Sequence, residues 1–345
     1  MVSGFSASPI QRLHQFLKDN QQIEAVQPLT PDASTREYFR INWNDKSAIA
    51  CVYPEPFDAL ENSYLDVTTL FQAGGLPVAE IYTVDDDAGI IIQEDFGDLI
   101  LRNALREALP DERENLINKA IRLIPKIQAA TKKAFELNSI ASRLKFDEEK
   151  LLWELNFFKT HYFETLRKVK LPETEDKLLS AEFTELSREL ERHAKVLCHR
   201  DFHAANLMID DENRLRIIDH QDARIGSVAY DLVSLLLDRI HEPPPNDWLK
   251  EKKYFFLAER ESLGLEEIDE ADFDYEFDLM TVQRCLKAIG TFSFQSVNRG
   301  KTHYVQFIEP MFEVVLNSCR KLDRFPNLQQ IIGNTALTDI LMQGH

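Results

Sequence analysis

The sequence predicts an α+β protein of two lobes, with a small N-terminal lobe built on an antiparallel sheet and a large, mostly helical C-terminal lobe. Three observations support this prediction. Five short apolar runs, separated by polar turns, fall within the first 95 residues. From residue 98 onward, apolar residues recur at spacings of three and four, as in amphipathic helices. A chain of 345 residues is long enough for two lobes, which we place at residues 1–95 and 96–345.

The N-terminal lobe is predicted to contain two helices and five strands. Ser8 is a good helix cap and Pro9 suits the first helical position, so a helix is expected over residues 8–19. A second helix is expected over residues 56–73, with Glu61 on it, because a glycine pair follows at 74–75. The strands are expected at 23–29, 38–43, 48–53, 78–84 and 90–93.

The C-terminal lobe is predicted to be helical except near its centre. Residues 207–209 and 215–218 are typical of a hairpin around a polar turn, and a short strand is expected at 196–198. Such a hairpin would hold Asn206 and Asp219 side by side at its open ends. Apolar periodicity predicts helices near 98–108, 111–132, 147–169, 173–193, 230–239 and 273–297, and one that follows prolines 243–245 and ends near residue 263.

Polar residues at fixed offsets flank the predicted hairpin. Asn206 follows Asp201 by five positions, and Asp219 follows Asn206 by thirteen. The same spacing occurs between the catalytic loop and the metal-binding aspartate of kinases. An amide oxygen and a carboxylate suit Mg²⁺ bound to ATP, and a further carboxylate can accept the proton of an acceptor hydroxyl. The pattern therefore predicts a protein-kinase-like fold with ATP and Mg²⁺ as cofactors, Asp201 as base, and Asn206 and Asp219 as metal ligands. An ordinary hairpin between solvated acids is the alternative.

The segment around this hairpin resembles a known superfamily. His199-Arg-Asp-Phe-His-Ala-Ala-Asn206 is similar to the loop of aminoglycoside phosphotransferases and choline kinases, with His203 in place of the protein-kinase lysine. The continuation Ile218-Asp-His-Gln-Asp-Ala-Arg-Ile-Gly226 is similar to the bacterial anomeric N-acetylmuramate/N-acetylglucosamine kinases of cell-wall recycling. The run Asp32-Ala-Ser-Thr-Arg-Glu-Tyr-Phe-Arg40 and the residues around Gln283 extend the similarity over about residues 32–316.

The resemblance implies where a nucleotide binds. The loop 30–37 is expected to cover the phosphates, although it contains no glycine. Kinases usually carry a phosphate-pairing lysine on the third strand, and residues 48–53 contain none, so Arg36, Arg40 or Lys46 is expected to replace it. Backbone groups of the hinge between the lobes are expected to hold the adenine. The predicted nucleotide contacts are Ser34, Thr35, Arg36, Arg40, Glu94 and Phe96.

The resemblance also implies which residues contact the acceptor. A run on one face of the predicted helix 273–297 is similar to a run in the sugar kinases. Asp231 is expected to accept hydrogen bonds from the catalytic loop. Aromatic residues within 153–163 are expected to form either core packing or the floor of a sugar pocket. The predicted acceptor contacts are His203, Asp222, Arg224, Gln283, Arg284 and Lys287.

Composition excludes several other classes of protein. A net charge of −18 argues against non-specific binding to nucleic acid, which needs a basic surface. The sequence shows neither an apolar run of membrane-spanning length nor the pattern of a signal peptide. The four cysteines are scattered and are expected to be reduced thiols. These features predict a cytoplasmic protein that contacts neither membrane nor nucleic acid, with no obligate protein partner evident.

These observations favour one function and leave alternatives open. The leading hypothesis is an ATP- and Mg²⁺-dependent kinase that phosphorylates the anomeric hydroxyl of N-acetylmuramate and/or N-acetylglucosamine. One alternative is a kinase for an aminoglycoside, choline or another amino alcohol, in which Asp222 and aromatic residues would surround a cation. The other is a nucleotide-binding pseudokinase, which the missing strand lysine suggests and the intact Asp201, Asn206 and Asp219 set argues against.

Overall fold

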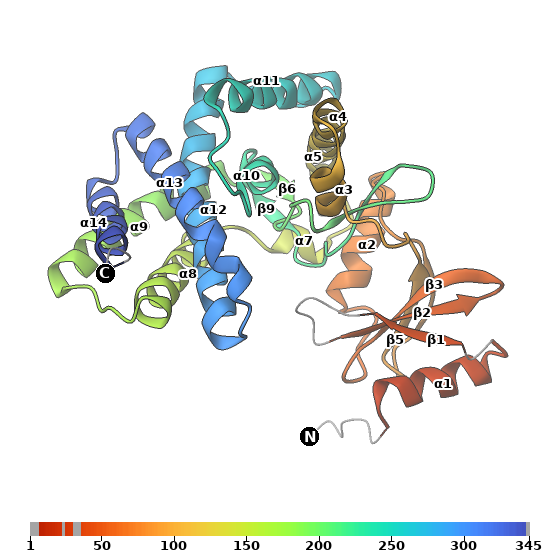
Figure 1. Cartoon of the computed structure of the whole chain (residues 1–345). Coiled ribbons are helices and arrows are strands. Elements are labelled where there is room, and N and C mark those ends of the chain that lie inside the picture. The colour runs from red at the N-terminus through yellow and green to blue at the C-terminus, as the bar shows by residue number, and fades with distance from the viewer. Residues whose placement is uncertain (1–6, 23–24, 30–35, 343–345) are drawn as a thin grey trace. The chain divides into compact units, whose positions relative to one another are not determined.

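The structure is a computed structural model that describes residues 7–22, 25–29 and 36–342, with side chains up to residue 334. The chain divides into two compact units (Figure 1). The first unit comprises residues 1–108 and 205–222, and the second comprises residues 109–204 and 223–345. The hairpin that follows the predicted catalytic loop thus belongs to the first unit. The lobe boundary expected at residue 95 stays a prediction.

An antiparallel sheet forms the centre of the first unit. Among the described residues it has five strands, in the order β1-β2-β3-β5-β4. Tyr38 pairs with Cys51, and Ala50 pairs with Ile92, which fixes the register of the three central strands. The strands are β1 (Val26–Leu29), β2 (Glu37–Trp43), β3 (Lys46–Val52), β4 (Ile81–Asp85) and β5 (Ile90–Glu94). The sheet predicted for the N-terminal lobe is confirmed.

Each face of the sheet packs against one helix, because successive residues of a strand point to opposite sides. Helix α1 (Pro9–Asp19) is capped by Ser8 and buries its apolar side on one face, where Phe39 and Ile92 lie (Figure 1). Helix α2 (Ser63–Ala73) covers the other face, where Tyr64 packs with Cys51 and Ile91. The alternation seen in the sequence therefore produces a three-layer unit.

Helix α2 begins later than the sequence predicts. The side chain of Asn62 accepts hydrogen bonds from the N–H groups of Tyr64 and Leu65, and so it caps the helix at Ser63. Residues 56–62 lie outside the helix, and Glu61 is exposed in the turn before it. The placement of Glu61 on this helix is wrong, because propensity did not reveal the Asn62 cap.

The hairpin predicted after the catalytic loop is confirmed as β7 (Leu207–Ile209) and β8 (Leu215–Ile217). Asp210 stabilises its turn by accepting the N–H groups of Glu212 and Arg214. The N–H of Ile209 donates to the carbonyl of Leu99 at 2.8 Å, just before helix α3 (Leu101–Glu107). These bonds attach the hairpin to the first unit.

The second unit is mostly helical. It contains two short strands, β6 (Val196–Cys198) and β9 (Arg224–Gly226), paired antiparallel, among its described residues. Its helices are α4 (Pro110–Ile121), α5 (Leu123–Ala129), α6 (Thr131–Glu136), α7 (Ile140–Arg143), α8 (Glu148–Lys159), the π-helix η1 (Thr160–Leu166), α9 (Glu173–His193), α10 (Tyr230–Leu237), α11 (Asn246–Ser262), α12 (Glu270–Asn298), the 3₁₀-helix η2 (Thr302–Phe307), α13 (Ile308–Leu322) and α14 (Pro326–Met342).

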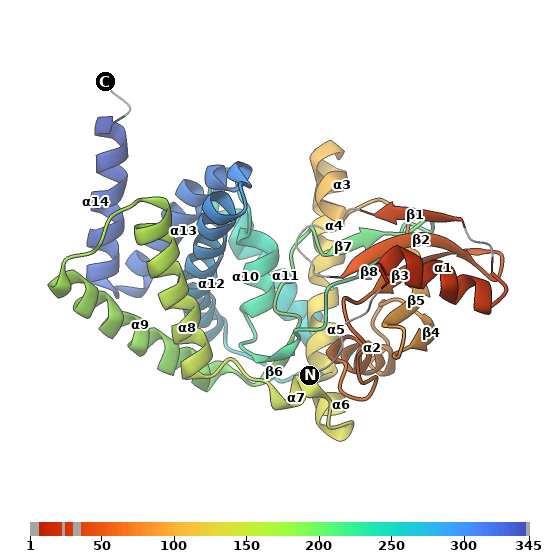
Figure 2. The ribbon, with the colours of Figure 1, turned by 90° about the horizontal axis from the view of Figure 1, so that it is seen from below.

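The long helix α12 is the centre of this second unit (Figure 2). It packs against α8, α10, α13 and η1. Where it crosses α8, a Cβ atom on Gly290 would lie 2.6 Å from the Cα of Phe158. Glycine at this position therefore allows the two helices to approach closely.

Two of the long helices that the sequence predicts are interrupted. The helix expected at 111–132 is divided into α4, α5 and α6. The break between α4 and α5 arises because Pro125 has no N–H to donate to the carbonyl of Ile121. The helix expected at 147–169 leaves the α conformation after Lys159 and continues as η1. In the described part of the chain, none of the helices is both long enough and apolar enough to cross a membrane.

Candidate active site

The predicted catalytic loop follows strand β6 and is held by an aspartate of α10. Asp231 accepts the backbone N–H of His199 at 2.7 Å and that of Arg200 at 3.1 Å. Arg200 needs this support, because its φ of 86° lies in the left-handed region that non-glycine residues seldom adopt. Burial raises the pKa of Asp231 to about 6, although His199 and the two N–H donors act to lower it. The predicted supporting role of Asp231 is confirmed.

Cationic side chains surround the carboxylate of Asp201. Lys287 of α12 donates from Nζ to Asp201 Oδ1 at 2.7 Å. Arg284, three residues earlier on that helix, lies 3.5 Å from the same oxygen, and Arg200 Nε lies 3.9 Å from Oδ2. The Asp201 side chain is 26% exposed, so the group remains open to solvent. The second unit therefore brings the predicted base together with two of the predicted acceptor residues.

These cations keep Asp201 ionised. Burial alone would raise the pKa of Asp201, but Lys287, Arg200 and Arg284 hold it well below its usual range. Arg284 is nearly buried and also donates to Ser234 and Asp238, both at 2.9 Å. Because Arg284 is fixed by these bonds, it supplies a stationary positive charge beside Asp201. The carboxylate is consequently in the form that can accept a proton at neutral pH.

The other predicted acceptor residues of the second unit are less accessible. Burial lowers the pKa of His203 to about 4, so its imidazole, 3.5 Å from Arg239, is neutral at pH 7. Gln283 is fully buried and donates to Glu154 at 2.9 Å. Arg224 is buried, with its guanidinium over an aromatic ring. Gln283 and Arg224 are packed inside the unit, and their predicted contacts with an acceptor stay predictions.

The first unit brings the two predicted metal ligands together. Asn206 donates from Nδ2 to Asp219 Oδ2 at 3.2 Å, and the N–H of Ile218 donates to the Asn206 carbonyl at 3.1 Å. Gln221 donates to the other carboxylate oxygen of Asp219 at 2.7 Å. The side-by-side arrangement expected from the sequence is therefore confirmed. Asp222, which follows, is half-buried in the same unit.

This pair fits a magnesium ion that is bound mainly through phosphates. Mg²⁺ usually takes one or two ligands from the protein and the rest from phosphates and water. Asn206 offers an amide oxygen, and the exposed Asp219 offers a carboxylate. The described residues contain no group of three or more His, Cys, Asp or Glu side chains arranged to hold a metal. The donor set thus suits a metal that arrives with a nucleotide.

The segment after β5 is tied to β2 by an arginine. Arg40 binds Asp95 through two hydrogen bonds of 2.7 and 3.1 Å, and it binds Asp98 at 2.9 Å. Burial would raise the pKa of Asp95, but hydrogen bonds from Arg40, Ser47 and Gly97 lower it. The charge of Arg40 is therefore balanced by carboxylates of this segment.

The predicted adenine contacts lie in the same segment. The backbone N–H of Glu94 already donates to the carbonyl of Glu80 at 2.9 Å. The Glu94 carboxylate accepts from Arg216 at 2.5 Å, and the guanidinium of Arg216 lies 4.0 Å from the centre of the Phe96 ring. A contact from Glu94 to adenine would thus require its carbonyl oxygen, and the roles of Glu94 and Phe96 stay predictions.

The other predicted phosphate contacts differ in their surroundings. Ser34 and Thr35 lie outside the described residues. Lys46 is exposed at the start of β3, directly after the turn that joins it to β2. Arg36 is half-buried, and its guanidinium carbon lies within 6 Å of the ring centres of three tyrosines, Tyr38, Tyr53 and Tyr64. Arg36 is thus packed among aromatic rings on the side of the sheet that faces α2.

Two buried polar residues, one in each unit, are not predicted from the sequence. Glu154 of α8 is 1% exposed, accepts from Gln283 and lies 4.0 Å from Arg200. Thr68 of α2 is also 1% exposed and contacts His220. Each lies on the buried side of its helix, where a polar residue usually has a specific partner. A polar residue on the apolar side of a predicted helix was the sequence signal that could have identified Glu154 and Thr68.

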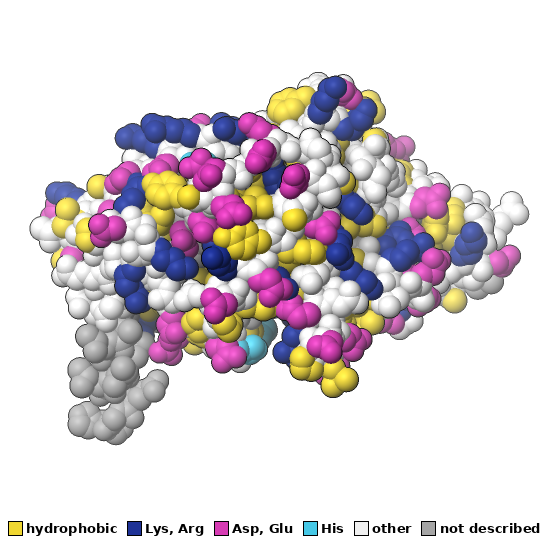
Figure 3. All heavy atoms as spheres, turned by 90° about the horizontal axis from the view of Figure 1, so that it is seen from above, with side chains coloured by type: hydrophobic (Ala, Val, Ile, Leu, Met, Phe, Trp, Pro, Cys, Tyr) yellow, Lys and Arg dark blue, Asp and Glu magenta, His cyan; other side chains and the backbone are white. Residues whose placement is uncertain are grey.

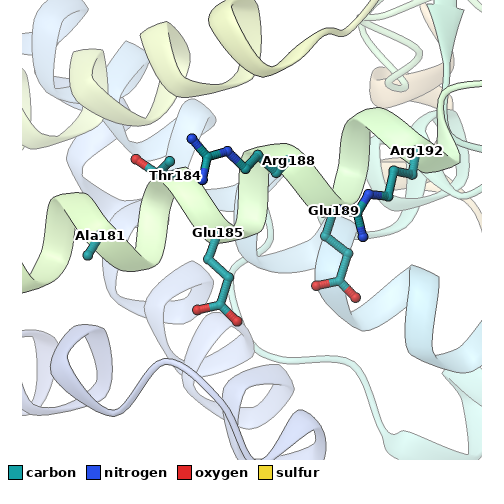
Figure 4. Close-up of a pocket in the computed structure, with 6 residues that line it drawn as sticks. All are labelled: Ala181, Thr184, Glu185, Arg188, Glu189 and Arg192. Carbon is teal, nitrogen blue, oxygen red and sulfur yellow. The ribbon is translucent and has the colours of Figure 1, made fainter.

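A pocket lies along helix α9 of the second unit (Figure 4). Three of its charged side chains are paired, since Glu185 binds Arg324 at 2.6 Å, Glu189 binds Arg324 at 2.5 Å, and Arg188 binds Glu148 at 3.0 Å. On the face drawn in Figure 3, basic and acidic side chains are likewise interspersed. The α9 pocket contains none of the predicted site residues, so we do not assign the active site to it.

Comparison with known proteins supports the kinase interpretation. Four curated proteins match the chain, and each is named N-acetylmuramate/N-acetylglucosamine kinase. The one from Neisseria meningitidis is 29% identical over 300 residues, which cover 85% of this chain and 84% of the relative.

Solved structures with the same fold include two kinases. A choline kinase from Streptococcus pneumoniae has a TM-score of 0.56 and 13% identity, over 89% of this chain and 98% of its own. A microcompartment-associated aminopropanol kinase has a TM-score of 0.60 and 16% identity, over 91% and 98%. These similarities confirm the predicted protein-kinase-like fold. The model of the phosphotransferase enzyme family matches residues 25–265, which is well over half of the chain. The protein therefore belongs to the phosphotransferase enzyme family.

Proposed function

We propose that this protein is an ATP- and Mg²⁺-dependent kinase that phosphorylates the anomeric hydroxyl of N-acetylmuramate and/or N-acetylglucosamine. The observation that carries phosphoryl transfer is the pairing of Asn206 with Asp219 at 3.2 Å, in the first unit. The choice of acceptor is supported by the four curated relatives, which share one name and match 85–93% of the chain.

Asn206 and Asp219 would hold Mg²⁺ together with the ATP phosphates. When bound there, the ion supplies positive charge that offsets the charge of the transferring phosphoryl group. The Asp219 carboxylate already accepts amide donors on both oxygens, so its orientation is fixed before a metal binds. Such preorganisation lowers the cost of assembling the site.

Asp201 accepts the proton of the acceptor hydroxyl in this proposal. Its carboxylate is ionised, and Lys287 occupies one oxygen at 2.7 Å. The ammonium and the fixed guanidinium of Arg284 hold the carboxylate in one orientation, which general-base catalysis requires. His203, Arg284 and Lys287, all near this group, are the acceptor contacts that we favour.

Arg36 is the cation that we propose in place of the strand lysine. Arg40 is balanced by Asp95 and Asp98, and Lys46 is exposed at the start of β3. Arg36 instead lies beside Tyr64 of α2, on the face of the sheet opposite α1. It also borders the loop 30–35, which we expect to cover the phosphates.

The aromatic residues of α8 and η1 argue against a cationic acceptor such as choline. Phe158, Tyr162 and Phe163 are buried, so they form core. Trp153 is 56% exposed, but the ammonium of Lys150 lies 4.1 Å from its ring centre. A ring that already holds a cation is poorly placed to bind a cationic acceptor.

The test is a panel of acceptors assayed by ADP release, followed by ³¹P NMR of the product. The panel contains N-acetylmuramate, N-acetylglucosamine, glucose, choline, ethanolamine and an aminoglycoside. We expect turnover with one or both N-acetyl sugars and a phosphorus signal coupled to the anomeric proton. A 6-phosphate would refute the anomeric assignment, and preference for an amine would refute the acceptor class. Nucleotide binding without turnover on any acceptor would favour the pseudokinase alternative.

A further inference from the structure

His220 follows the proposed metal ligand Asp219, and the mechanism above gives it no role. Its side chain is 1% exposed and lies in the first unit beside helix α2. Burying an imidazole is unfavourable unless its polar atoms find partners. The partner given by the structure is the hydroxyl of Thr68, at 2.7 Å from Nε2. This hydrogen bond joins helix α2 to His220, the residue next to the proposed metal ligand Asp219.

The direction of this hydrogen bond can be deduced. The Thr68 hydroxyl lies 2.6 Å from the carbonyl oxygen of Tyr64, and a carbonyl cannot donate. The hydroxyl hydrogen therefore goes to Tyr64. A hydroxyl has one hydrogen, so Thr68 must accept from His220, and Nε2 must carry the proton. His220 is thus a fixed donor toward α2.

Aromatic rings of the same helix also hold the imidazole. The centre of the His220 ring lies 5.1 Å from that of Tyr64 and 5.3 Å from that of Phe71. Tyr64, Thr68 and Phe71 are spaced by four and three residues, which places them on one side of α2. Helix α2 therefore holds the His220 side chain in place through both a hydrogen bond and the packing of aromatic rings.

The backbone conformation of Asp219 explains why fixing the neighbouring His220 is important. Asp219 has a φ of 62°, in the left-handed region, where a residue other than glycine needs support from its surroundings. Its carboxylate orientation depends on this conformation, because Asn206 and Gln221 bind the two oxygens. Fixing the next residue restricts the backbone dihedrals at Asp219.

We infer that His220 is a positioning residue, which uses its Nε2–H bond to Thr68 to make the metal-binding orientation of Asp219 depend on helix α2. This inference rests on the proposed function, since it takes Asp219 as a metal ligand. A helix that covers the sheet thereby acts on the metal site. Displacement of α2 would release Asp219, so the position of the helix and metal affinity are coupled.

The experiment measures Mn²⁺ binding in the presence of a non-hydrolysable ATP analogue, using the full chain. Thr68→Val removes the hydroxyl and keeps the shape of the side chain. Thr68→Ser keeps the hydroxyl. Thr69→Val is a matched control, because Thr69 makes the same type of bond to the carbonyl of Leu65, at 2.9 Å, on the exposed side of α2. Thermal unfolding without metal is measured for each variant.

We expect Thr68→Val to weaken Mn²⁺ binding by about two- to tenfold, the effect of one lost hydrogen bond. Thr68→Ser and Thr69→Val should stay within about twofold of the wild type. If Thr68→Val and Thr69→Val lower thermal stability alike and leave Mn²⁺ binding unchanged, Thr68 is only structural and the inference fails. The variant Asp219→Ala distinguishes a failure of the proposed metal site from a failure of its coupling to α2. If that variant binds Mn²⁺ normally, the proposed metal site itself is wrong.

Discussion

Replacing Lys287 with methionine should shift the pH dependence of the reaction. Lys287 donates to Asp201 at 2.7 Å, and it is the first of the charged groups that lower the pKa of that carboxylate. A hydrogen bond to a charged group contributes about 1.5–3 kcal/mol. At 1.36 kcal/mol per pKa unit, its loss should raise the pKa of Asp201 by about one to two units.

The sign of the effect follows from the role of a base. Asp201 must be ionised to accept a proton, so activity falls as the pH drops through its pKa. Because the wild-type pKa is lowered, we expect the wild-type rate to persist in acid, and the acid limb of the Lys287→Met variant to lie at higher pH.

The assay is kcat/KM for the acceptor against pH, measured by ADP release. Lys287→Arg should keep most of the wild-type profile because it keeps the charge. Lys177→Met is a matched control, because Lys177 pairs with Glu173 at the same 2.7 Å but on the exposed surface, where such pairs contribute little. If the acid limbs of Lys287→Met and the wild type coincide, then Lys287 does not tune Asp201 and the reasoning fails.

Four further predictions concern other parts of the chain. Arg36→Ala should raise the KM for ATP by about tenfold or more, the effect of a lost charge-assisted hydrogen bond, and change the acceptor KM much less. Arg40→Ala should instead lower the unfolding temperature, because it breaks the pair with Asp95. The hydrogen bond to Glu276 raises the pKa of His193, so this bond stabilises the fold at low pH and its contribution is lost as pH rises through that pKa. Urea unfolding should therefore show a larger loss for His193→Ala near pH 6 than near pH 9. Gly290→Ala should destabilise the protein by about 1–3 kcal/mol, measured by urea unfolding, because the added Cβ would meet the backbone of α8 at 2.6 Å.

For Arg36, His193 and Gly290, a specific result would contradict the prediction. A double variant of Arg36 and Arg40 with the wild-type KM for ATP would show that neither contacts phosphate. If His193→Ala destabilises the protein equally at both pH values, the charge on His193 does not contribute to stability and the prediction is wrong. Gly333→Ala is the control for Gly290, because an added Cβ there meets nothing within 4 Å. Equal stability of the two alanine variants would mean that α12 and α8 can separate at no cost.

Local sequence signals predicted the parts of the site that depend on neighbours in the chain. The hairpin was predictable because apolar runs flank a polar turn, and its geometry sets Asn206 beside Asp219. Asp231 was predictable only through the family resemblance. The start of α2 was missed because the Asn62 cap outweighs the helical appearance of residues 56–61.

Long-range contacts were not predictable from one sequence. Glu154 and Gln283 are 129 positions apart, and Thr68 and His220 are 152 apart. Neither pair leaves a local signal beyond a polar residue on a buried helix face. Arg40 was proposed as a phosphate contact because of its place on β2, and only the structure shows its pairing with Asp95. Such pairings depend on packing that spacing and periodicity do not specify.

The turnover of Asp201→Asn tests the central claim most directly. The substitution keeps the size of the side chain and removes its ability to accept a proton at neutral pH. We predict normal folding and normal binding of the Mg²⁺–ATP analogue, with kcat on the acceptor sugar lowered by about 10²–10⁴-fold. Binding that is unchanged together with kcat within about threefold of the wild type would contradict the assignment of Asp201 as the base.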